Sequence, residues 1–259
     1  MKKNYKKALP FFALLNLAHF SFSQKTDSTK TINHFSGAVS FTNNGISMIP
    51  TFTLGKPAAI VNLSIGSKKL SFEPELKFSI EGKPWGFIFW WRYKLVNSGK
   101  FRMNVGAHPA LAFSTVSLPL EGVAKEKEVI VAKRFLAAEI SPTYFLSKNL
   151  SVGVYYLYAR GLSSDATKNI HFFTINTSIS NIKLSNQFFM RVTPQFYYLK
   201  LDAQDGFYFT SAFTLAKKNF PLSVSAIINK TINTNITGSK NFVWNASLVY
   251  SFNKTYVNR

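Results

Sequence analysis

The sequence lacks cysteine, is poor in acidic residues, and has no long apolar run after its first two dozen residues. With no cysteine in 259 residues, disulfides, thiolate metal sites and attachment of a lipid to an N-terminal cysteine are excluded. No segment after the N-terminal region carries 18 or more consecutive apolar residues, so a transmembrane helix is not expected. The 11 acidic residues stand against 31 basic ones, so the chain is strongly cationic.

The N-terminus has the pattern of a secretory signal. Four lysines lie within the first seven residues, Ala8–Ala18 form a short apolar stretch, and small residues occupy the −3 and −1 positions before Gln24. This order predicts a signal peptide over 1–23 that is cleaved on export. A membrane anchor is the weaker interpretation, because Pro10 and Asn16 interrupt an apolar run that is already short.

The positive charge persists after the predicted cleavage. Loss of the four signal lysines lowers the formal net charge from +20 to +16. An exported chain has no usual nucleic-acid partner, and its lysines do not form one basic arm. Many of them fall at predicted turns such as Ser67–Lys69, Ser147–Asn149 and Lys217–Lys218. We therefore expect the partners to be membrane lipid and lipopolysaccharide, whose phosphates attract basic residues at a membrane rim.

Apolar and polar residues alternate through most of the remaining chain. The clearest case is 85–96, and 70–80 and 101–114 repeat the pattern. One face of 85–96 carries Trp85, Phe87, Phe89, Trp91, Tyr93 and Leu95. A period of two in segments of about ten residues or more is typical of strands that face lipid on one side and a lumen on the other.

This pattern predicts an all-β, antiparallel, up-and-down transmembrane β-barrel. Thirteen alternating segments can be read, yet single-chain bacterial barrels have even strand numbers. Either 35–43 lies outside the wall, or one long segment forms two strands. We expect 12 strands, with 10 or 14 as alternatives. The predicted domains are a periplasmic segment at 24–34, the barrel at 35–253 and a tail at 254–259. The thirteen segments are 35–43, 46–55, 58–66, 70–80, 85–96, 101–114, 129–146, 149–161, 170–182, 186–200, 206–216, 221–232 and 240–252.

The last segment orients the barrel. Asn241–Phe252 alternates and ends on an aromatic residue, as the closing strand of an outer-membrane barrel does at its periplasmic end. Counting hairpins backwards places the turns Ser147–Asn149, Leu184–Asn186 and Lys217–Asn219 in the periplasm. The longer polar stretches at 117–128, 162–169, 201–206 and 233–240 then fall outside the cell, as expected for such barrels.

A soluble β-sandwich or a lipocalin-like barrel also alternates. Its apolar face would have to be interior, yet aromatic faces recur here with few large residues opposite. The transmembrane interpretation is therefore preferred, and a bacterial outer membrane is the expected location.

The signal, the repeated hairpins and the segment Ser141–Gly153 (SPTYFLSKNLSVG) together resemble the outer-membrane β-barrel proteins of Bacteroidota. The resemblance extends over the whole mature chain. It implies the architecture and the location, and it implies no particular activity.

A search for catalytic patterns yields little. His34-Phe35-Ser36 has strand spacing for a Ser–His pair, but it lies at the start of the barrel and no orienting acid or amide accompanies it. Glu73 and Glu75 form a same-face acid pair, for which partners in a salt-bridge ladder are the more economical explanation. No spacing of ligands predicts a metal site or a cofactor. We therefore name no catalytic residue, and an enzyme is the less favoured class.

The strand parity predicts which polar side chains face the lumen. Such charges need partners when the barrel is narrow, and their mild basic excess would favour anions if the lumen is open. The predicted lumenal charges are Glu73, Glu75, Lys77, Arg92, Lys94, Arg102, Lys133, Glu139 and Arg191. The predicted uncharged lumenal polar residues are His108 and Gln195.

Three functions follow from this architecture. The first is a porin-like channel or transporter for small polar or anionic solutes, suggested by the charged inner face. The second is a non-channel accessory barrel in a larger outer-membrane assembly, with an envelope protein as its partner. The third is an enzyme that modifies lipids or peptides.

Overall fold

A computed structural model of the chain describes residues 32–119 and 126–257. The predicted signal peptide at 1–23 and the following residues up to 31 lie outside the described residues. Within the described ranges the structure is almost entirely strand, with one 3-10 turn at Pro50–Phe52 (η2). No helix of the described residues is long and apolar enough to cross a membrane.

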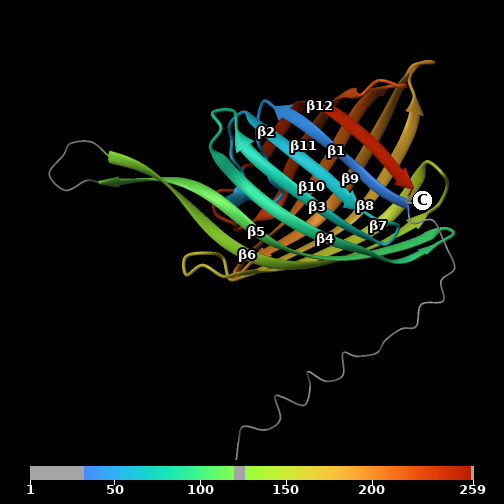
Figure 1. The fold of residues 1–259 in the computed structure, drawn as a ribbon. Helices are drawn as coiled ribbons and strands as arrows, with labels where there is room; N and C mark the ends of the chain where they lie inside the picture. The colour runs from blue at the N-terminus through green and yellow to red at the C-terminus, as the bar shows by residue number, and fades with distance from the viewer. Residues whose placement is uncertain (1–31, 120–125, 258–259) are drawn as a thin grey trace, which may run out of the picture. The chain divides into compact units, whose positions relative to one another are not determined.

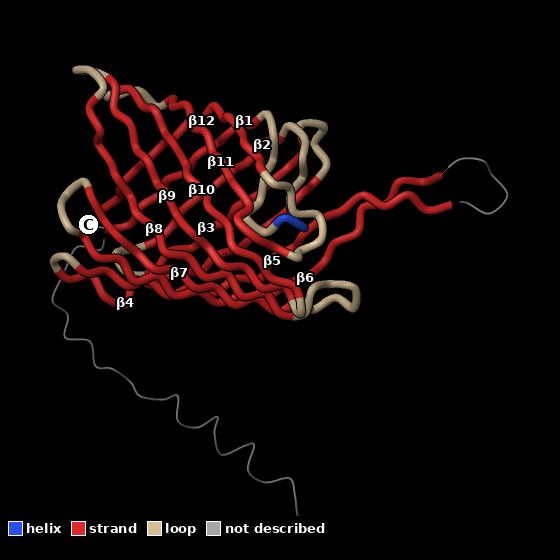
Figure 2. Tube along the Cα trace, turned by 180° about the vertical axis from the view of Figure 1, so that it is seen from behind, coloured by secondary structure: helices blue, strands red, loops and turns tan. Residues whose placement is uncertain are grey.

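Twelve antiparallel strands close into a barrel in which each strand pairs with its neighbours in sequence and β1 pairs with β12 (Figures 1 and 2). This confirms the predicted up-and-down barrel and its strand number. The strands extend beyond the predicted limits of 35 and 253. They are β1 (Ile32–Thr42), β2 (Ala58–Gly66), β3 (Leu70–Ser79), β4 (Pro84–Ser98), β5 (Phe101–Pro119), β6 (Glu126–Phe145), β7 (Leu150–Gly161), β8 (Asn169–Lys183), β9 (Phe188–Leu201), β10 (Gln204–Lys217), β11 (Leu222–Thr234) and β12 (Phe242–Val257).

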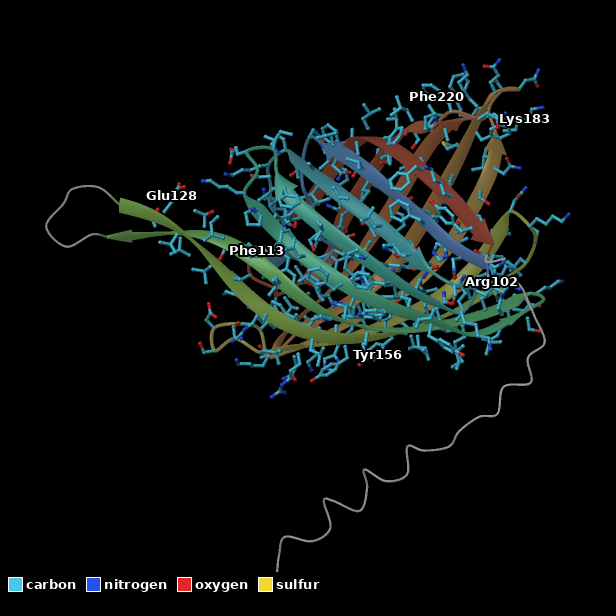
Figure 3. All side chains as sticks on the ribbon, in the orientation of Figure 1. Arg102, Phe113, Glu128, Tyr156, Lys183 and Phe220 are labelled. Atoms are coloured by element: carbon cyan, nitrogen blue, oxygen red, sulfur yellow. The ribbon has the colours of Figure 1, made fainter. Side chains whose placement is uncertain are left out.

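Large apolar side chains cover the outside of the wall. Trp91 on β4 is 52 % exposed and Phe196 on β9 is 60 % exposed, and Tyr156 points away from the wall in Figure 3. Aromatic residues at such exposure are unfavourable in water and favourable against hydrocarbon. The residues at the alternate positions face the interior, as the period of two requires, and include large buried side chains such as Tyr197 and Tyr208 beside small and polar ones.

The predicted segment 46–55 is not a strand, and this is the error in the count of thirteen. The segment 35–43 lies in the wall as β1, whereas 43–57 forms the connection between β1 and β2. Pro50 begins the η2 turn and lacks the backbone N–H that a strand ladder needs. The apolar residues of this segment alternate because several of them pack inside the barrel.

The strand ends define two rims. Ile32 and Val257 pair at one rim, which we call the terminal end, and the opposite rim is the distal end. The turns predicted to share the periplasmic side, at 147–149, 184–186 and 217–219, all lie at the terminal end. The connections at 43–57, 80–83, 162–168, 202–203 and 235–241 lie at the distal end.

The β5–β6 hairpin extends well beyond the other strands at the distal end (Figure 1). Its pairing continues without interruption to Pro119 and Glu126. The neighbouring strands stop earlier, since β4 begins at Pro84 and β7 ends at Gly161. The outer part of this hairpin is therefore a two-stranded ribbon with a free edge on each side.

Candidate functional site: the barrel lumen

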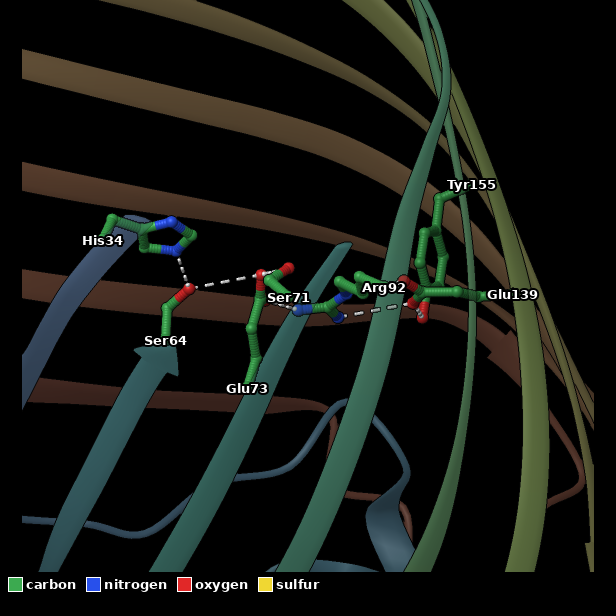
Figure 4. A network of polar contacts seen from close by, with 7 residues as sticks. All are labelled: His34, Ser64, Ser71, Glu73, Arg92, Glu139 and Tyr155. Atoms are coloured by element: carbon green, nitrogen blue, oxygen red, sulfur yellow. Dashed lines mark hydrogen bonds and ion pairs between the residues drawn. The ribbon is translucent and has the colours of Figure 1, made fainter. Parts of the chain in front are cut away.

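A network of polar contacts runs along the inner face of the neighbouring strands β1–β7 (Figure 4). Arg92 on β4 is its centre: Nη1 donates to Glu73 Oε2 at 2.6 Å, and Nε donates to Glu139 Oε1 at 2.6 Å. The Tyr155 hydroxyl on β7 donates to the other oxygen of Glu139 at 2.7 Å. Four strands are joined in this way, and the network carries one net negative charge.

A glycine on β5 makes the contact between Arg92 and Glu139 possible. Arg92, Gly106 and Glu139 are aligned in register on β4, β5 and β6, so the guanidinium must pass over β5. A Cβ at Gly106 would lie 2.9 Å from Glu139 Oε1 and 3.1 Å from Arg92 Cγ. The absence of a side chain at Gly106 therefore leaves the space that the ion pair occupies.

The network continues toward β1. Glu73 Oε1 accepts a hydrogen bond of 2.7 Å from the Ser71 hydroxyl and lies 3.5 Å from the Ser64 hydroxyl. His34 Nε2 lies 2.8 Å from that same Ser64 hydroxyl. The serine that His34 contacts therefore lies on the next strand and is not Ser36 of the same strand.

The order of these contacts differs from that of a nucleophile activated for acyl transfer. In such sites the histidine lies between the serine and the acid. Here Ser64 lies between His34 and Glu73, and no hydrogen bond to His34 Nδ1 is formed within the described part of the chain. The arrangement anchors side chains to the wall.

The other predicted lumenal acid also has a cationic neighbour. Glu75 forms an ion pair with Lys77 on the same face of β3. The Lys77 ammonium lies 5.2 Å from the ring centre of Trp85. Parity alone would place Trp85 toward lipid, but it is buried at 6 % exposure, next to the register shift of the β3–β4 pairing.

The remaining predicted cations lie near the two rims. At the distal end, Lys133 pairs with Asp165 of the 162–168 connection at 3.0 Å. At the terminal end, Arg102 donates to the side chain of Asn97 at 3.1 Å (Figure 3). Among the described residues, three of these cations have no carboxylate partner. We call these the mouth cations: Lys94, Arg102 and Arg191.

The two uncharged residues predicted to face the lumen, His108 and Gln195, lie farther from the rims than these cations. His108 is 6 % exposed, and its ring stands edge-on to Trp90 with centroids 3.9 Å apart. Gln195 Nε2 lies 3.2 Å from the sulfur of Met48. Within the described part of the chain, no cluster of three or more His, Cys, Asp or Glu is arranged to hold a metal ion.

Met48 belongs to the 43–57 connection, which folds into the barrel; we call it the inserted loop. Figure 2 shows its 3-10 turn at the distal mouth, turned toward the interior. The Trp85 indole donates to the carbonyl of Phe52 at 2.7 Å, and the Phe52 ring packs edge-on against Phe135 at 5.2 Å. On the opposite wall the Tyr197 hydroxyl lies 3.2 Å from the carbonyl oxygen of Met48.

Three cavities follow one another past this loop. A distal cavity of about 500 Å³ lies outside it, and an inner cavity of about 510 Å³ lies beneath it. A smaller cavity of about 160 Å³ lies between them, and we call it the neck. Phe52 and Trp85 line both the neck and the distal cavity, and Ile49 and Trp90 line both the neck and the inner cavity. The three therefore adjoin one another; the distal cavity and the neck lie along β3–β8, and the inner cavity also reaches β9, β10 and β11.

Elsewhere the distal half of the lumen is filled. Buried apolar side chains from β6–β10 form one cluster with residues of the distal connections. Its members are Phe135, Ala137, Ala159, Ala166, Ile170, Phe172, Tyr197, Leu199, Leu201, Tyr208 and Ile236. The distal cavity and the neck are therefore displaced to one side of the barrel.

Only part of the inserted loop and of the lumenal contacts could be predicted from the sequence. Pro50, Gly55 and Pro57 are poor strand residues and mark 46–55 as a possible connection. Nothing in the sequence indicates that this connection turns inward. Tyr155 was missed as a partner of Glu139 because parity gives the face of a side chain and not the register between strands.

No protein-family model and no curated protein matches the sequence. Among solved structures, the KdgM porin superposes with a TM-score of 0.53 at 11 % identity, covering 84 % of this chain and 99 % of that one. This chain has the fold of an outer-membrane porin barrel. At this identity the likeness extends to the fold alone, and membership of the Bacteroidota group stays a prediction.

Two further structures align less well. The NanC porin gives a TM-score of 0.45 at 13 % identity, covering 86 % of this chain and 100 % of that one. An outer membrane channel from Pseudomonas putida F1 gives 0.46 at 11 % identity, covering 86 % and 95 %.

Proposed function

We propose that this protein is an integral outer-membrane barrel that acts as a porin-like channel for small polar solutes, anions included. The observation that carries the proposal is the series of three cavities inside a closed barrel. The inserted loop narrows the lumen between them, so passage would be limited to small molecules.

The proposed preference for anions rests on the cationic residues at the two ends of the lumen. The mouth cations line the terminal end, and the distal cavity is lined by three lysines, Lys56, Lys83 and Lys133, against Glu81 and Asp165. The network around Arg92 carries one net negative charge, but its carboxylates are bound to Arg92. Positive mouths raise the local concentration of anions, whereas the paired charges of the network give little selectivity.

In this proposal the terminal end faces the periplasm. Ile32 and Val257, the outer ends of β1 and β12, and short turns lie there, whereas the longest described connections, 43–57, 162–168 and 235–241, lie at the distal end, as in bacterial outer-membrane barrels. The inserted loop would then enter the lumen from the outside of the cell.

Conductance across planar bilayers tests the proposal. Folded protein should give small, discrete current steps, and a salt gradient should give a reversal potential on the anion-selective side. Circular dichroism and heat-modifiable migration on gels would establish that the inserted protein is folded. A complete lack of current from folded protein would overturn the channel proposal.

Lipopolysaccharide is the proposed lipid partner at the distal end. An aromatic row, Tyr156, Phe173, Tyr198 and Phe207, runs in register across the outside of β7–β10. Exposed cations lie on the outer face near the distal rim. This distal cation row consists of Arg134, Arg160, Lys200 and Lys230.

Phosphates of lipopolysaccharide complement such a row. Changing the four cations to glutamine should at least halve the lipopolysaccharide that copurifies, measured by mass spectrometry. The matched control changes four lysines at the terminal end: Lys148, Lys183, Lys217 and Lys218. Equal retention in both variants would contradict the proposed site.

The projecting β5–β6 hairpin favours a second candidate function, an accessory barrel bound to another envelope protein. Exposed edges with β-branched residues such as Val116, Ile130 and Val131 are sites at which another strand can add. Purification from native membranes in mild detergent should then yield one partner at fixed stoichiometry. Recovery of the barrel alone would count against this function.

A further inference from the structure

The neck is the most apolar of the three cavities. Large apolar side chains line most of it, among them Ile49, Phe52, Trp85, Phe135, Leu157 and Ile170. The polar side chains at its surface are few, with Ser47, Lys77 and His108 among them. A water molecule needs two to four polar partners to be held in a cavity, and most of the neck offers none.

The size of the neck fits one six-membered ring. A protein cavity of about 150 Å³ lined by leucine, isoleucine and phenylalanine stays dry and binds benzene. The neck measures about 160 Å³ and has a similar lining. An inorganic ion would lose part of its hydration there, so the neck slows the passage of ions and keeps the current small.

The aromatic residues of the neck offer suitable contacts for a ring. Phe52 and Phe135 already meet edge-to-face at 5.2 Å, and Trp85 and Trp90 line the chamber from β4. Aromatic rings favour such edge-to-face and offset arrangements. A planar ring between these walls would extend contacts that the side chains make with one another.

The inner cavity supplies what the rest of such a molecule needs. It adjoins the neck and is lined by the hydrogen-bonding side chains Glu75, Lys77, Thr174, Asn176, Gln195 and Asn229. A polar substituent on a ring held in the neck would therefore find donors and acceptors on the terminal side. An entirely apolar molecule would leave these groups without a partner.

We propose that the neck binds the ring of a monocyclic aromatic solute that carries one polar group, and that this is the solute class the channel admits. The second clause rests on the proposed channel function, whereas the binding site does not. Ile49 and Phe52 belong to the inserted loop, so the site exists only while that loop lies in the lumen.

Fluorine NMR of 4-fluorophenol with the detergent-solubilised barrel tests the site. Wild-type protein should give saturable broadening and shift of the fluorine signal above that of empty micelles. Unlabelled phenol and benzoate should compete, and glucose should not. Saturable binding that glucose displaces, or no binding beyond that of the micelles, would overturn the proposal.

Two alanines provide a matched pair of variants. Ala159 lines the neck and is 6 % exposed, whereas Ala138 is exposed on the outer face of β6. Ala159→Phe fills the neck and should weaken binding at least tenfold, while Ala138→Phe should leave it unchanged. Unchanged binding in folded Ala159→Phe would refute the site.

A third variant tests the site independently if Ala159→Phe does not fold. Phe52 lies on the inserted loop and not in the barrel wall, so Phe52→Ala enlarges the neck without changing a strand. It should lower the affinity for phenol and raise that for 2-naphthol, which has two rings. No change in this preference would contradict the assignment.

The failure of the site and that of the channel are distinguishable. Binding without conductance would retain the site and remove the channel. Conductance that phenol and benzoate do not alter, together with an absence of binding, would retain the channel and remove the site.

Discussion

Replacing Arg92 by methionine is expected to destabilise the barrel more than any other single change of a lumenal cation. Arg92 holds Glu73 and Glu139 with two hydrogen bonds of 2.6 Å. Methionine retains most of the apolar stem but removes the charge, so two carboxylates would face each other across β4 and β5 with no cation between them. Glu139 would keep only the hydrogen bond from Tyr155.

The magnitude follows from the exposure of the three side chains. Removing one member of a buried ion pair costs about 3–5 kcal/mol. The Glu139 side chain is 2 % exposed, whereas those of Arg92 and Glu73 are 32 % and 26 % exposed. Water therefore screens part of the repulsion, and we expect a loss of ~3 kcal/mol in the free energy of unfolding.

Urea unfolding in phospholipid vesicles, followed by tryptophan fluorescence, measures this loss. Lys94→Met is the matched control, because Lys94 is also a lumenal cation of β4 but has no carboxylate partner among the described residues; it should change stability by less than about 0.5 kcal/mol. Adding Glu73→Gln and Glu139→Gln to Arg92→Met should restore at least half of the loss. Equal losses in Arg92→Met and Lys94→Met would refute the reasoning.

Other consequences of the structure can be checked separately. Gly106→Val should cost about 2 kcal/mol in the same unfolding assay, because its side chain would displace the ion pair; a stable variant would show that the network tolerates a bulky neighbour. Replacing residues 46–54 by a glycine–serine linker should raise the single-channel conductance several-fold, and an unchanged conductance would mean that the inserted loop does not limit the path. Changing the three mouth cations to glutamine should move the reversal potential toward cation selectivity, and no shift would place the selectivity elsewhere. Backbone N–H groups of Lys168 and Asn169 lower the pKa of Asp202. These hydrogen bonds are therefore present at neutral pH and lost as the pH falls through this lowered value; the hydrogen-exchange protection of the amides in 162–169, corrected for the intrinsic exchange rate, should fall with them and be low at all pH values in Asp202→Ala.

The wall could be predicted from the sequence because a membrane imposes a simple rule. Each strand residue faces either hydrocarbon or the interior, so the alternation of Phe87, Phe89 and Trp91 with their neighbours indicates the strand and its outer face directly. The same rule misassigned 46–55. Ile49 and Phe52 are apolar because they pack inside the barrel, and a period of two cannot distinguish burial against lipid from burial against the opposite wall.

The lumen was harder to predict for a different reason. Parity placed Glu73, Arg92 and Glu139 on the inner face, but their contact depends on the register of four strands and on the missing side chain of Gly106. Register follows from hairpin geometry and from bulges, such as the shift in the β3–β4 pairing that brings Trp85 inward. Single-sequence patterns carry little information about such shifts.

The strand number explains why the interior needs more than its own inward side chains. Eight strands enclose a space that side chains just fill, and wider barrels must be plugged or remain open. In this barrel of 12 strands the surplus space is occupied on one side by the cluster around Tyr197 and Leu199, and at the distal end by the inserted loop. Phe52 holds the loop to the wall through Trp85 and also lines the neck. The position of the loop and the width of the path therefore depend on the same contact, and neither can change without the other.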